Sequence, residues 1–250
     1  MITERLFRFF KSDSLRESWI IKSRIMQQII IAGISLYNAA ASRTGLFKKN
    51  IGKSCGEGIQ IGKHSVIAPD SLVIGIKCRI HDYAVLEPGT RIGNNVVIGP
   101  GTIVGSEGFE IRRIGDQLIP IVHTGGVVIS DDVLIGSHVC IDKSLNGDCT
   151  EISEKTQVED NVHIAHGVKI GKNCAIASSV MIGGKVTIGN AVRIGPAAKI
   201  ADQLTIGDGA ILSAGAVVTK NVAPGQKVTG NFAINHERFL RHIQNINKEE

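Results

Sequence analysis

Aliphatic side chains recur at every sixth position through most of the second half of this chain. The run keeps its phase from Ile152 to Val218 and passes through Ile164, Ile182 and Ile200. A small or branched apolar residue follows four positions after most of these aliphatics. An amphipathic helix would place apolar residues at i, i+3, i+4 and i+7, which this run does not do. A fixed period of six is typical of stacked coils, so the pattern predicts a parallel β-helix.

The same period begins earlier, at Ile61, and is interrupted twice by excursions over residues 105–127 and 143–151. The predicted fold class is therefore all-β, a β-helix of hexapeptide repeats with short helical ends. Near the C-terminus, apolar residues share one face of a predicted amphipathic helix. We expect a partly helical N-terminal segment, a β-helix, and a C-terminal extension with a helix: 1–60, 61–223 and 224–250.

Counting the hexads in threes assigns them to faces, because three hexads, about 18 residues, complete one triangular coil in solenoids of this repeat. Adjacent coils lie about 4.8 Å apart. One column then holds the hexads that begin at Val104, Ile141, Ile164, Ile182, Ile200 and Val218. Both excursions leave from this column. Loops on one side of a repeat array usually mark its binding face.

His166 is the third residue of its hexad in this column. Its predicted neighbours on the coils below and above are Asp142, Lys143, Gly184, Asp202 and Gln203. An imidazole can take a proton from an amine or hydroxyl, and a glycine N–H can stabilise the oxyanion of a tetrahedral intermediate. The grouping therefore favours acyl transfer. The alternative is that His166 is a surface turn residue and Gly184 only a repeat glycine.

The net charge of +5 and the pI near 9.0 favour anionic partners, such as an acidic carrier protein, phosphopantetheine or a sugar nucleotide. Nucleic acid is not expected, because the chain has no Lys/Arg run and no interleaving of basic and aromatic residues. The five cysteines show no CxxC spacing, which favours a reducing, cytoplasmic compartment. Aromatic residues make up only 4% of the chain, as a narrow aliphatic core requires.

The histidines predict no metal site. Zinc-binding hexapeptide proteins use two histidines five apart, and no two histidines of this chain have that spacing. His163 lies close to His166 in sequence, and we expect it to contact substrate rather than metal. His123 lies in the longer excursion, where a histidine is more often solvated than functional.

The N-terminal segment carries several basic residues between 5 and 24, followed by an uncharged run over 25–42. Polar residues inside this run, and its short apolar centre, argue against a spanning helix. We expect a helix packed on the solenoid. A helix on a membrane surface, or a cleaved or spanning one, remains the alternative.

Three motifs carry a resemblance to a known family. GSEGFEI at 105–111, CIDKSLNGDCTEI at 140–152 and VEDNVHIAHGVKIG at 158–171 resemble the UDP-3-O-acylglucosamine N-acyltransferases of lipid A biosynthesis. The resemblance covers roughly residue 92 to the C-terminus. It implies a left-handed coil, a homotrimer, and active sites in the clefts between subunits.

The resemblance also implies a role for each matching residue. His166 matches the general base that takes a proton from the glucosamine 2-amine, and Gly184 matches the oxyanion-stabilising N–H. Glu159 stands where the family has an acidic residue, usually Asp, and Gln203 stands at the position of a second histidine. The remaining candidates, expected to contact substrate, are Asp142, Lys143, His163, Phe109 and Asp202.

The expected function is transfer of an acyl group from acyl carrier protein, or from acyl-CoA, to the amine of a glucosamine-type sugar, with no permanently bound cofactor. Arg238 and Arg241 are expected to help dock the acidic carrier. The region 1–60 is shorter than the family's uridine-binding domain, so a UDP group on the acceptor stays open. The expected location is cytoplasmic, with contact at the inner membrane surface as an option. The alternatives are an acetyl-CoA-dependent sugar O/N-acetyltransferase and a non-catalytic scaffold.

Overall fold

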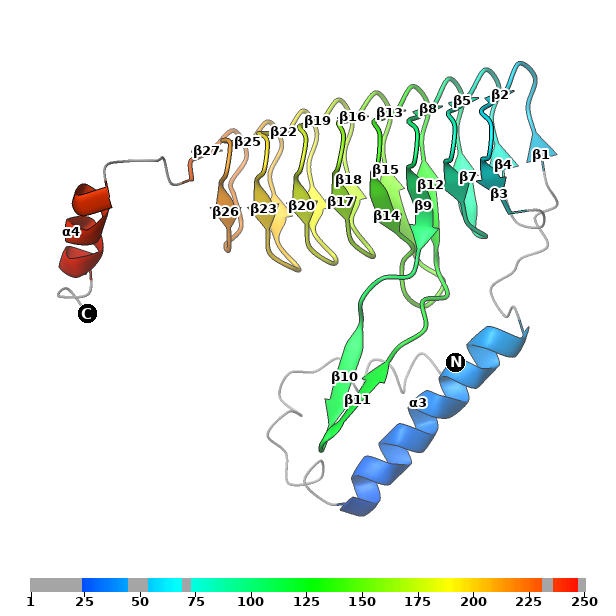
Figure 1. The fold of residues 1–250 in the computed structure, drawn as a ribbon, viewed down its shortest axis with the longest axis horizontal. Helices are drawn as coiled ribbons and strands as arrows, with labels where there is room; N and C mark the ends of the chain where they lie inside the picture. The colour runs from blue at the N-terminus through cyan, green and yellow to red at the C-terminus, as the bar shows by residue number, and fades with distance from the viewer. Residues whose placement is uncertain (1–23, 45–53, 69–72, 231–235, 247–250) are drawn as a thin grey trace.

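The computed structural model describes residues 24–44, 54–68, 73–230 and 236–246. It is a parallel β-helix, as the hexads predict, and its coils are stacked along the long axis of the molecule (Figure 1). The basic residues between 5 and 22 lie outside the described residues.

Three parallel sheets form the sides of the coil. The first contains β1 (Ser54–Cys55), β4 (Val73–Ile74), β7 (Thr90–Ile92), β12 (Gly126–Ile129), β15 (Cys149–Ile152), β18 (Lys169–Ile170), β21 (Thr187–Ile188) and β24 (Thr205–Ile206). The second contains β2 (Gln60–Ile61), β5 (Arg79–Ile80), β8 (Val97–Ile98), β13 (Leu134–Ile135), β16 (Gln157–Val158), β19 (Ala175–Ile176), β22 (Arg193–Ile194), β25 (Ile211–Leu212) and β27 (Lys227–Val228).

The third sheet, which we call the site sheet, lies on the predicted column. It contains β3 (Val66–Ile67), β6 (Val85–Leu86), β9 (Ile103–Ser106), β14 (Cys140–Asp142), β17 (His163–Ile164), β20 (Met181–Ile182), β23 (Lys199–Ile200) and β26 (Val217–Val218). Its register pairs Ile141 with Val104 and Ile164, and continues upward through Ile182, Ile200 and Val218. The column predicted from the period is confirmed.

The hexad pattern produces this coil because the two residues of each short strand point in opposite directions. In β17, Ile164 points inward and is fully buried while His163 points outward, and the same alternation repeats along the site sheet. A turn follows each strand, and its tightest residue often has a positive φ, as at Asn161. Asparagine and glycine adopt that backbone region most readily. Because each strand bonds to the coils above and below, most of the backbone polar groups of a coil are satisfied by its neighbours.

The ladders extend beyond the predicted limits of 61 and 223. They begin at β1 and end at β27, which pairs with β25. Ser54 and Cys55 lack the aliphatic residue that marks the other hexads, and Pro224 and Gly225 interrupt the sequence before Lys227. The apolar period therefore could not reveal either of these terminal coils.

The first excursion contains an antiparallel hairpin, β10 (Ile111–Ile114) and β11 (Gln117–Pro120), that projects from the coil (Figure 1). The helix α3 (Arg24–Thr44) lies beside this hairpin. A second apolar cluster joins them: Ile34 of α3 packs with Ile114 and Ile121 of the first excursion and Leu145 of the second. The predicted N-terminal helix thus packs on the excursions.

Polar contacts fix the same arrangement. The Asn38 side chain donates to Pro120 O at 2.8 Å and accepts from Val122 N at 3.1 Å. Tyr37 Oη donates to Asn146 Oδ1 at 3.0 Å. The helix is therefore bonded to both excursions.

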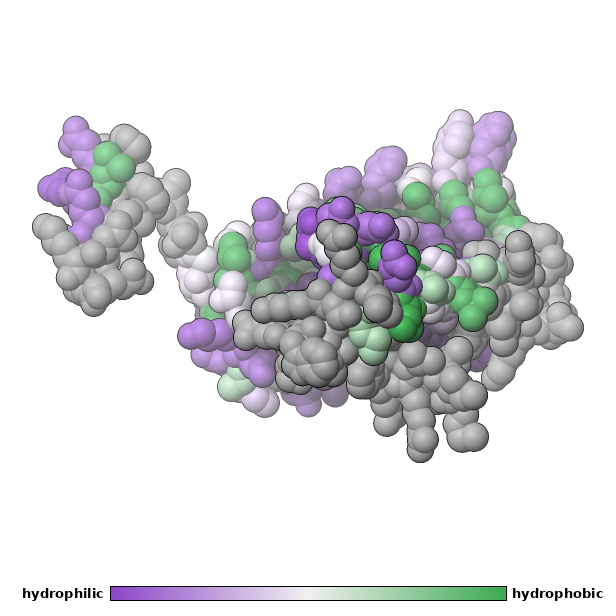
Figure 2. Space-filling view, turned by 90° about the horizontal axis from the view of Figure 1, so that it is seen from below, coloured by the Kyte–Doolittle hydropathy of each residue, from purple (hydrophilic) through white to green (hydrophobic). Residues whose placement is uncertain are grey.

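The second described helix, α4 (His236–Ile246), follows the last coil. In the described parts of the chain, neither α3 nor α4 has the length and apolarity needed to cross a membrane. Seen from below, hydrophobic side chains appear in separate patches along the coil, between hydrophilic ones (Figure 2).

Candidate active site

His166 lies at the turn after β17 and is buried, with only 8% of its surface exposed. Its backbone is held on both sides: Lys185 N donates to His166 O at 2.9 Å, and Gly167 N donates to Thr150 Oγ1 at 2.9 Å. Gly167 has a φ of +69°, a conformation that glycine adopts without strain. The turn therefore fixes where the imidazole can point.

The first excursion covers this imidazole, and we call its residues 107–123 the roof. Glu110 Oε2 lies 3.6 Å from His166 Nε2, and Arg112 Nη2 lies 2.7 Å from Glu110 Oε1. The ring of His123 meets the ring of His166 edge-on, with centroids 5.2 Å apart. The roof thus supplies a carboxylate and a second imidazole to the site.

His123 is buried, with 2% of its surface exposed. Neither ring nitrogen has a hydrogen-bond partner among the described residues, since the 3.5 Å from Nδ1 to Glu107 Oε2 is too long for a good hydrogen bond. The same carboxylate group accepts from His123 N at 3.1 Å and meets Lys143 Nζ at 2.6 Å. A buried imidazole without a partner is costly, so its place beside His166 points to a function.

Burial lowers the pKa of His166, and the charge of Lys185 lowers it further, while Glu110, Asp142 and Asp202 act in the opposite direction. Burial also lowers the pKa of His123, and His166 adds to that effect. Both imidazoles are therefore neutral near pH 7. A neutral imidazole is the form that can accept a proton.

Gly184 lies directly against the His166 ring. A Cβ added at Gly184 would be 2.8 Å from His166 Cε1, so only glycine leaves the ring in its place. The Gly184 N–H, however, donates to Asp202 Oδ1 at 2.8 Å. The same contact recurs at other coils, for example from Asn190 N to Asp208 Oδ1. The expected oxyanion donor is thus engaged in a repeat-wide hydrogen bond.

Several predicted residues do lie together here. On the coil below His166, Lys143 contacts the roof through Glu107, and Asp142 accepts from Ser106 Oγ at the end of β9. Asp142 Oδ2 also lies 3.1 Å from His163 Nε2, and this carboxylate raises the pKa of His163.

Other predicted residues are not brought to His166 within this chain. Glu159 follows β16 in the second sheet, is exposed, and accepts from Ser178 N at 3.1 Å. Glu159 belongs to the hexad before that of His166. Successive hexads lie on different sides of the coil, so the two residues do not share a face. Phe109 is 83% exposed, and Gln203 is exposed and reaches the site only through its N–H to Gly184 O.

Arg238 and Arg241 lie on α4, both exposed. Arg241 Nε donates to Glu237 O at 3.4 Å, a contact within the same helix. Sequence reasoning missed three site residues altogether or undervalued them: His123, Glu107 and Glu110. Two signals could have found them: all three fall in an excursion that leaves from the column of His166, and Glu107 and Glu110 belong to the GSEGFEI motif.

Comparison with known proteins agrees with this fold. The family described as bacterial transferase hexapeptide (six repeats) matches residues 71–106, 149–184 and 185–220. The hexapeptide repeat of succinyl-transferase matches residues 50–68. A UDP-3-O-acylglucosamine N-acyltransferase from Anaeromyxobacter dehalogenans is 30% identical over 99 residues, and one from Gloeobacter violaceus is 40% identical over 68 residues.

The chain therefore carries bacterial transferase hexapeptide repeats and is similar to acyltransferases of lipid A biosynthesis. The matches cover 35% and 27% of this chain, but only 28% and 19% of those two relatives. Among solved acyltransferase structures, LpxA from Acinetobacter baumannii superposes with a TM-score of 0.65 at 25% identity, covering 77% of this chain and 74% of that one. An Arabidopsis UDP-N-acetylglucosamine acyltransferase shares the fold, with a TM-score of 0.59, 22% identity and the same coverage of both chains.

Proposed function

We propose that this chain transfers an acyl group from the thioester of an acyl carrier protein to the amine of a glucosamine-type sugar. The observation that carries the proposal is the buried, neutral His166, confined by Gly184 and covered by the charged roof. The family, and the names of the relatives, support both the reaction class and the sugar acceptor.

In this mechanism His166 Nε2 accepts a proton as the sugar nitrogen attacks the thioester carbonyl. The C–N bond forms, the C–S bond breaks, and the imidazolium returns its proton to the leaving thiolate. Glu110, 3.6 Å from Nε2, stabilises the transient imidazolium. Gly184 N–H can serve the oxyanion only if Asp202 releases it, so rotation of the Asp202 side chain belongs to this mechanism.

A donor and acceptor screen tests the reaction. Acyl carrier protein thioesters of several chain lengths, acyl-CoA and acetyl-CoA are each offered with glucosamine-type acceptors, with and without UDP. Mass spectrometry then identifies any acylated sugar. We expect an N-acylated product with carrier-linked donors. Turnover with acetyl-CoA alone would instead favour a sugar acetyltransferase, and no product with any pair would favour a scaffold.

The pH dependence of kcat/KM should reflect the lowered pKa of His166. The base must be neutral, so activity falls only when the pH drops below that pKa, which lies below the ordinary value of 6.5. Lys185→Gln removes a charge that lowers this pKa, so the acidic limb should move to higher pH. Glu110→Gln removes a charge that raises it, so the limb should move to lower pH. Profiles measured from about pH 5 to pH 8 check both shifts. If the acidic limb of the kcat/KM profile lies at the same pH in both variants, the assignment of His166 as the base is contradicted.

We propose a homotrimer, because the outer positions of the site sheet are unusually apolar. Val66, Ile103, Met181 and Val217 lie in one row on this face, which also contains Cys140, His163 and Lys199, and 69% of the Val217 surface is exposed. Burial of such a column against other copies is favourable. Light scattering at micromolar concentration should give a mass of three chains. A mass of one chain would contradict both the trimer and an active site between subunits.

We also propose that α4 helps dock the acidic carrier protein through Arg238 and Arg241. Surface charges of this kind mainly change the association rate and its salt dependence. The double charge reversal to glutamate should therefore weaken carrier-dependent turnover most at low salt. Turnover with a small thioester, measured in parallel, should not change. Wild-type rates with the carrier across a salt series would show that docking occurs elsewhere.

A further inference from the structure

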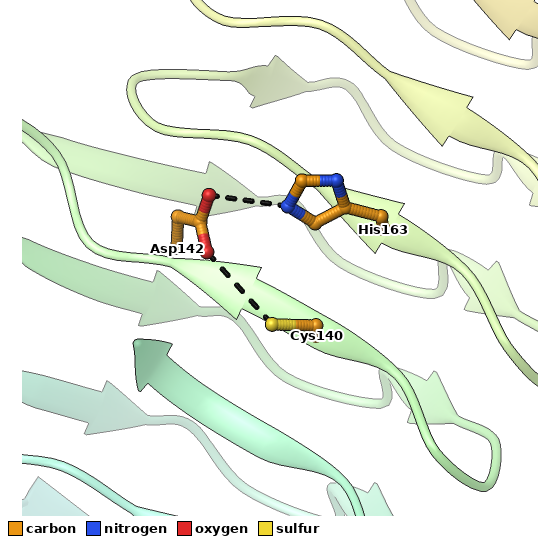
Figure 3. Close-up of side chains that lie close together, drawn as sticks. All are labelled: Cys140, Asp142 and His163. Atoms are coloured by element: carbon orange, nitrogen blue, oxygen red, sulfur yellow. Dashed lines mark hydrogen bonds and ion pairs between the residues drawn. The ribbon is translucent and has the colours of Figure 1, made fainter. Parts of the chain in front are cut away.

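A cysteine, an aspartate and a histidine meet on the outer surface of the site sheet (Figure 3). Cys140 and Asp142 flank the inward-pointing Ile141 of β14, so strand alternation turns both side chains outward. His163 is the register partner of Cys140 on the next coil. The three side chains therefore come from two adjacent strands of the rigid coil.

The ligand atoms of these residues lie within 4.8 Å of one another. Asp142 stands between the other two, with Oδ2 3.1 Å from His163 Nε2 and Oδ1 3.8 Å from Cys140 Sγ. Bonds of about 2.0–2.3 Å to a tetrahedral zinc ion separate its ligand atoms by about 3.3–3.8 Å. The two distances, one to each oxygen of Asp142, are close to that range, so small side-chain rotations would bring the thiolate, the carboxylate and the imidazole around one ion.

The surroundings suit a metal site. Asp142 is buried, and Ser106 Oγ donates to its Oδ1 at 2.7 Å and lies 3.1 Å from Cys140 Sγ. Hydrogen bonds from such a neighbour orient the ligands of a metal site. The His163 side chain is 46% exposed on the single chain, so no residue of the same coil fills the fourth coordination position.

We propose that Cys140, Asp142 and His163 form a binding site for a divalent transition metal ion of the zinc type. Thiolate, imidazole and carboxylate ligands together favour zinc over magnesium or calcium. Three protein ligands with a fourth, open position are the arrangement of zinc sites that bind water or substrate. Binding releases the thiol proton of Cys140 and replaces the proton shared by His163 and Asp142. Spacing between histidines could not reveal this site, because two of its ligands are not histidines.

Cobalt titration tests the site without any acyl-transfer assay. The full chain is freed of metal with a chelator and titrated with Co²⁺, which adopts zinc geometries and absorbs visible light. We expect one equivalent to give the strong bands of tetrahedral cobalt together with a thiolate-to-cobalt charge-transfer band in the near ultraviolet. Zn²⁺ added afterwards should abolish both, because zinc binds more tightly than cobalt.

Variants assign the ligands. Cys140→Ser should remove the charge-transfer band, and His163→Gln should weaken cobalt binding by at least tenfold. Cys149→Ser is the matched control, because Cys149 is a free, half-buried cysteine of the first sheet outside the cluster, and its spectrum should match the wild type. Absence of a stoichiometric band in the wild-type chain would overturn the proposal, and so would a charge-transfer band that persists in Cys140→Ser. Because the readout is spectroscopic, either result stands apart from the outcome of the donor screen.

Discussion

His166→Ala should lower kcat by about 10²–10⁴-fold while leaving the coil intact. In the proposed reaction this buried imidazole takes the proton of the sugar amine, and its lowered pKa keeps it neutral. The side chain lies outside the aliphatic interior, which is built from residues such as Ile164. Its loss removes the base without opening a cavity in that interior. Steady-state turnover with the best donor measures the loss of kcat, and a thermal melt measures whether the coil is intact.

His81→Ala is the control for this experiment. His81 is an exposed histidine that follows β5 in the second sheet, on another side of the coil. Its replacement should leave turnover unchanged. A His166→Ala variant with near-normal turnover would contradict the site assignment, and the lowered pKa would then describe only a buried turn residue.

Gly184→Ala should lower turnover by about 10²-fold with little change in thermal stability. The added methyl group would be 2.8 Å from His166 Cε1 and 2.9 Å from Nε2, so the ring has to move. Displacement of a catalytic group by about 1 Å can cost that much activity. The backbone at this position tolerates a side chain, because the equivalent positions of neighbouring hexads carry residues such as Ser178 and Asn190.

Ser178→Ala provides the matched comparison, since Ser178 occupies the same place in its hexad but faces a different side of the coil. That variant should keep both turnover and stability. Full activity in Gly184→Ala would mean that the ring position seen here is not the one used in catalysis. A melting temperature lowered in Gly184→Ala alone would instead assign Gly184 a structural role.

The sequence predicted the coil better than the site, and the reason is periodicity. A period of six determines which residues stack, so the register of Ile141, Ile164 and Ile182 followed from counting alone. The excursions have no period, so nothing in the sequence placed His123 beside His166. Glu159 was assigned because it lies seven residues before the base in the sequence. In the coil those seven residues pass a corner, so Glu159 and His166 lie on different sheets.

The Gly184 assignment shows a second limit. Counting coils correctly placed the glycine above His166, but the direction of its N–H depends on Asp202 of the following coil. Hydrogen-bond partners of this kind depend on side-chain rotamers, which the hexad pattern does not specify. Position was predictable from the repeat, whereas the availability of a donor was not.

The attachment of α3 to both excursions also determines the order in which the molecule can fold. Hydrogen bonds between coils join residues about 18 positions apart, as from Gly184 to Asp202, so the coil can grow from any segment by adding neighbours. The bond from Tyr37 to Asn146 spans 109 residues and forms only after that growth has brought the excursions together. Long-range contacts of this kind form late, because the chain must first lose the entropy of a large loop. We therefore expect α3 to dock on the two excursions only after the coils that carry them have formed.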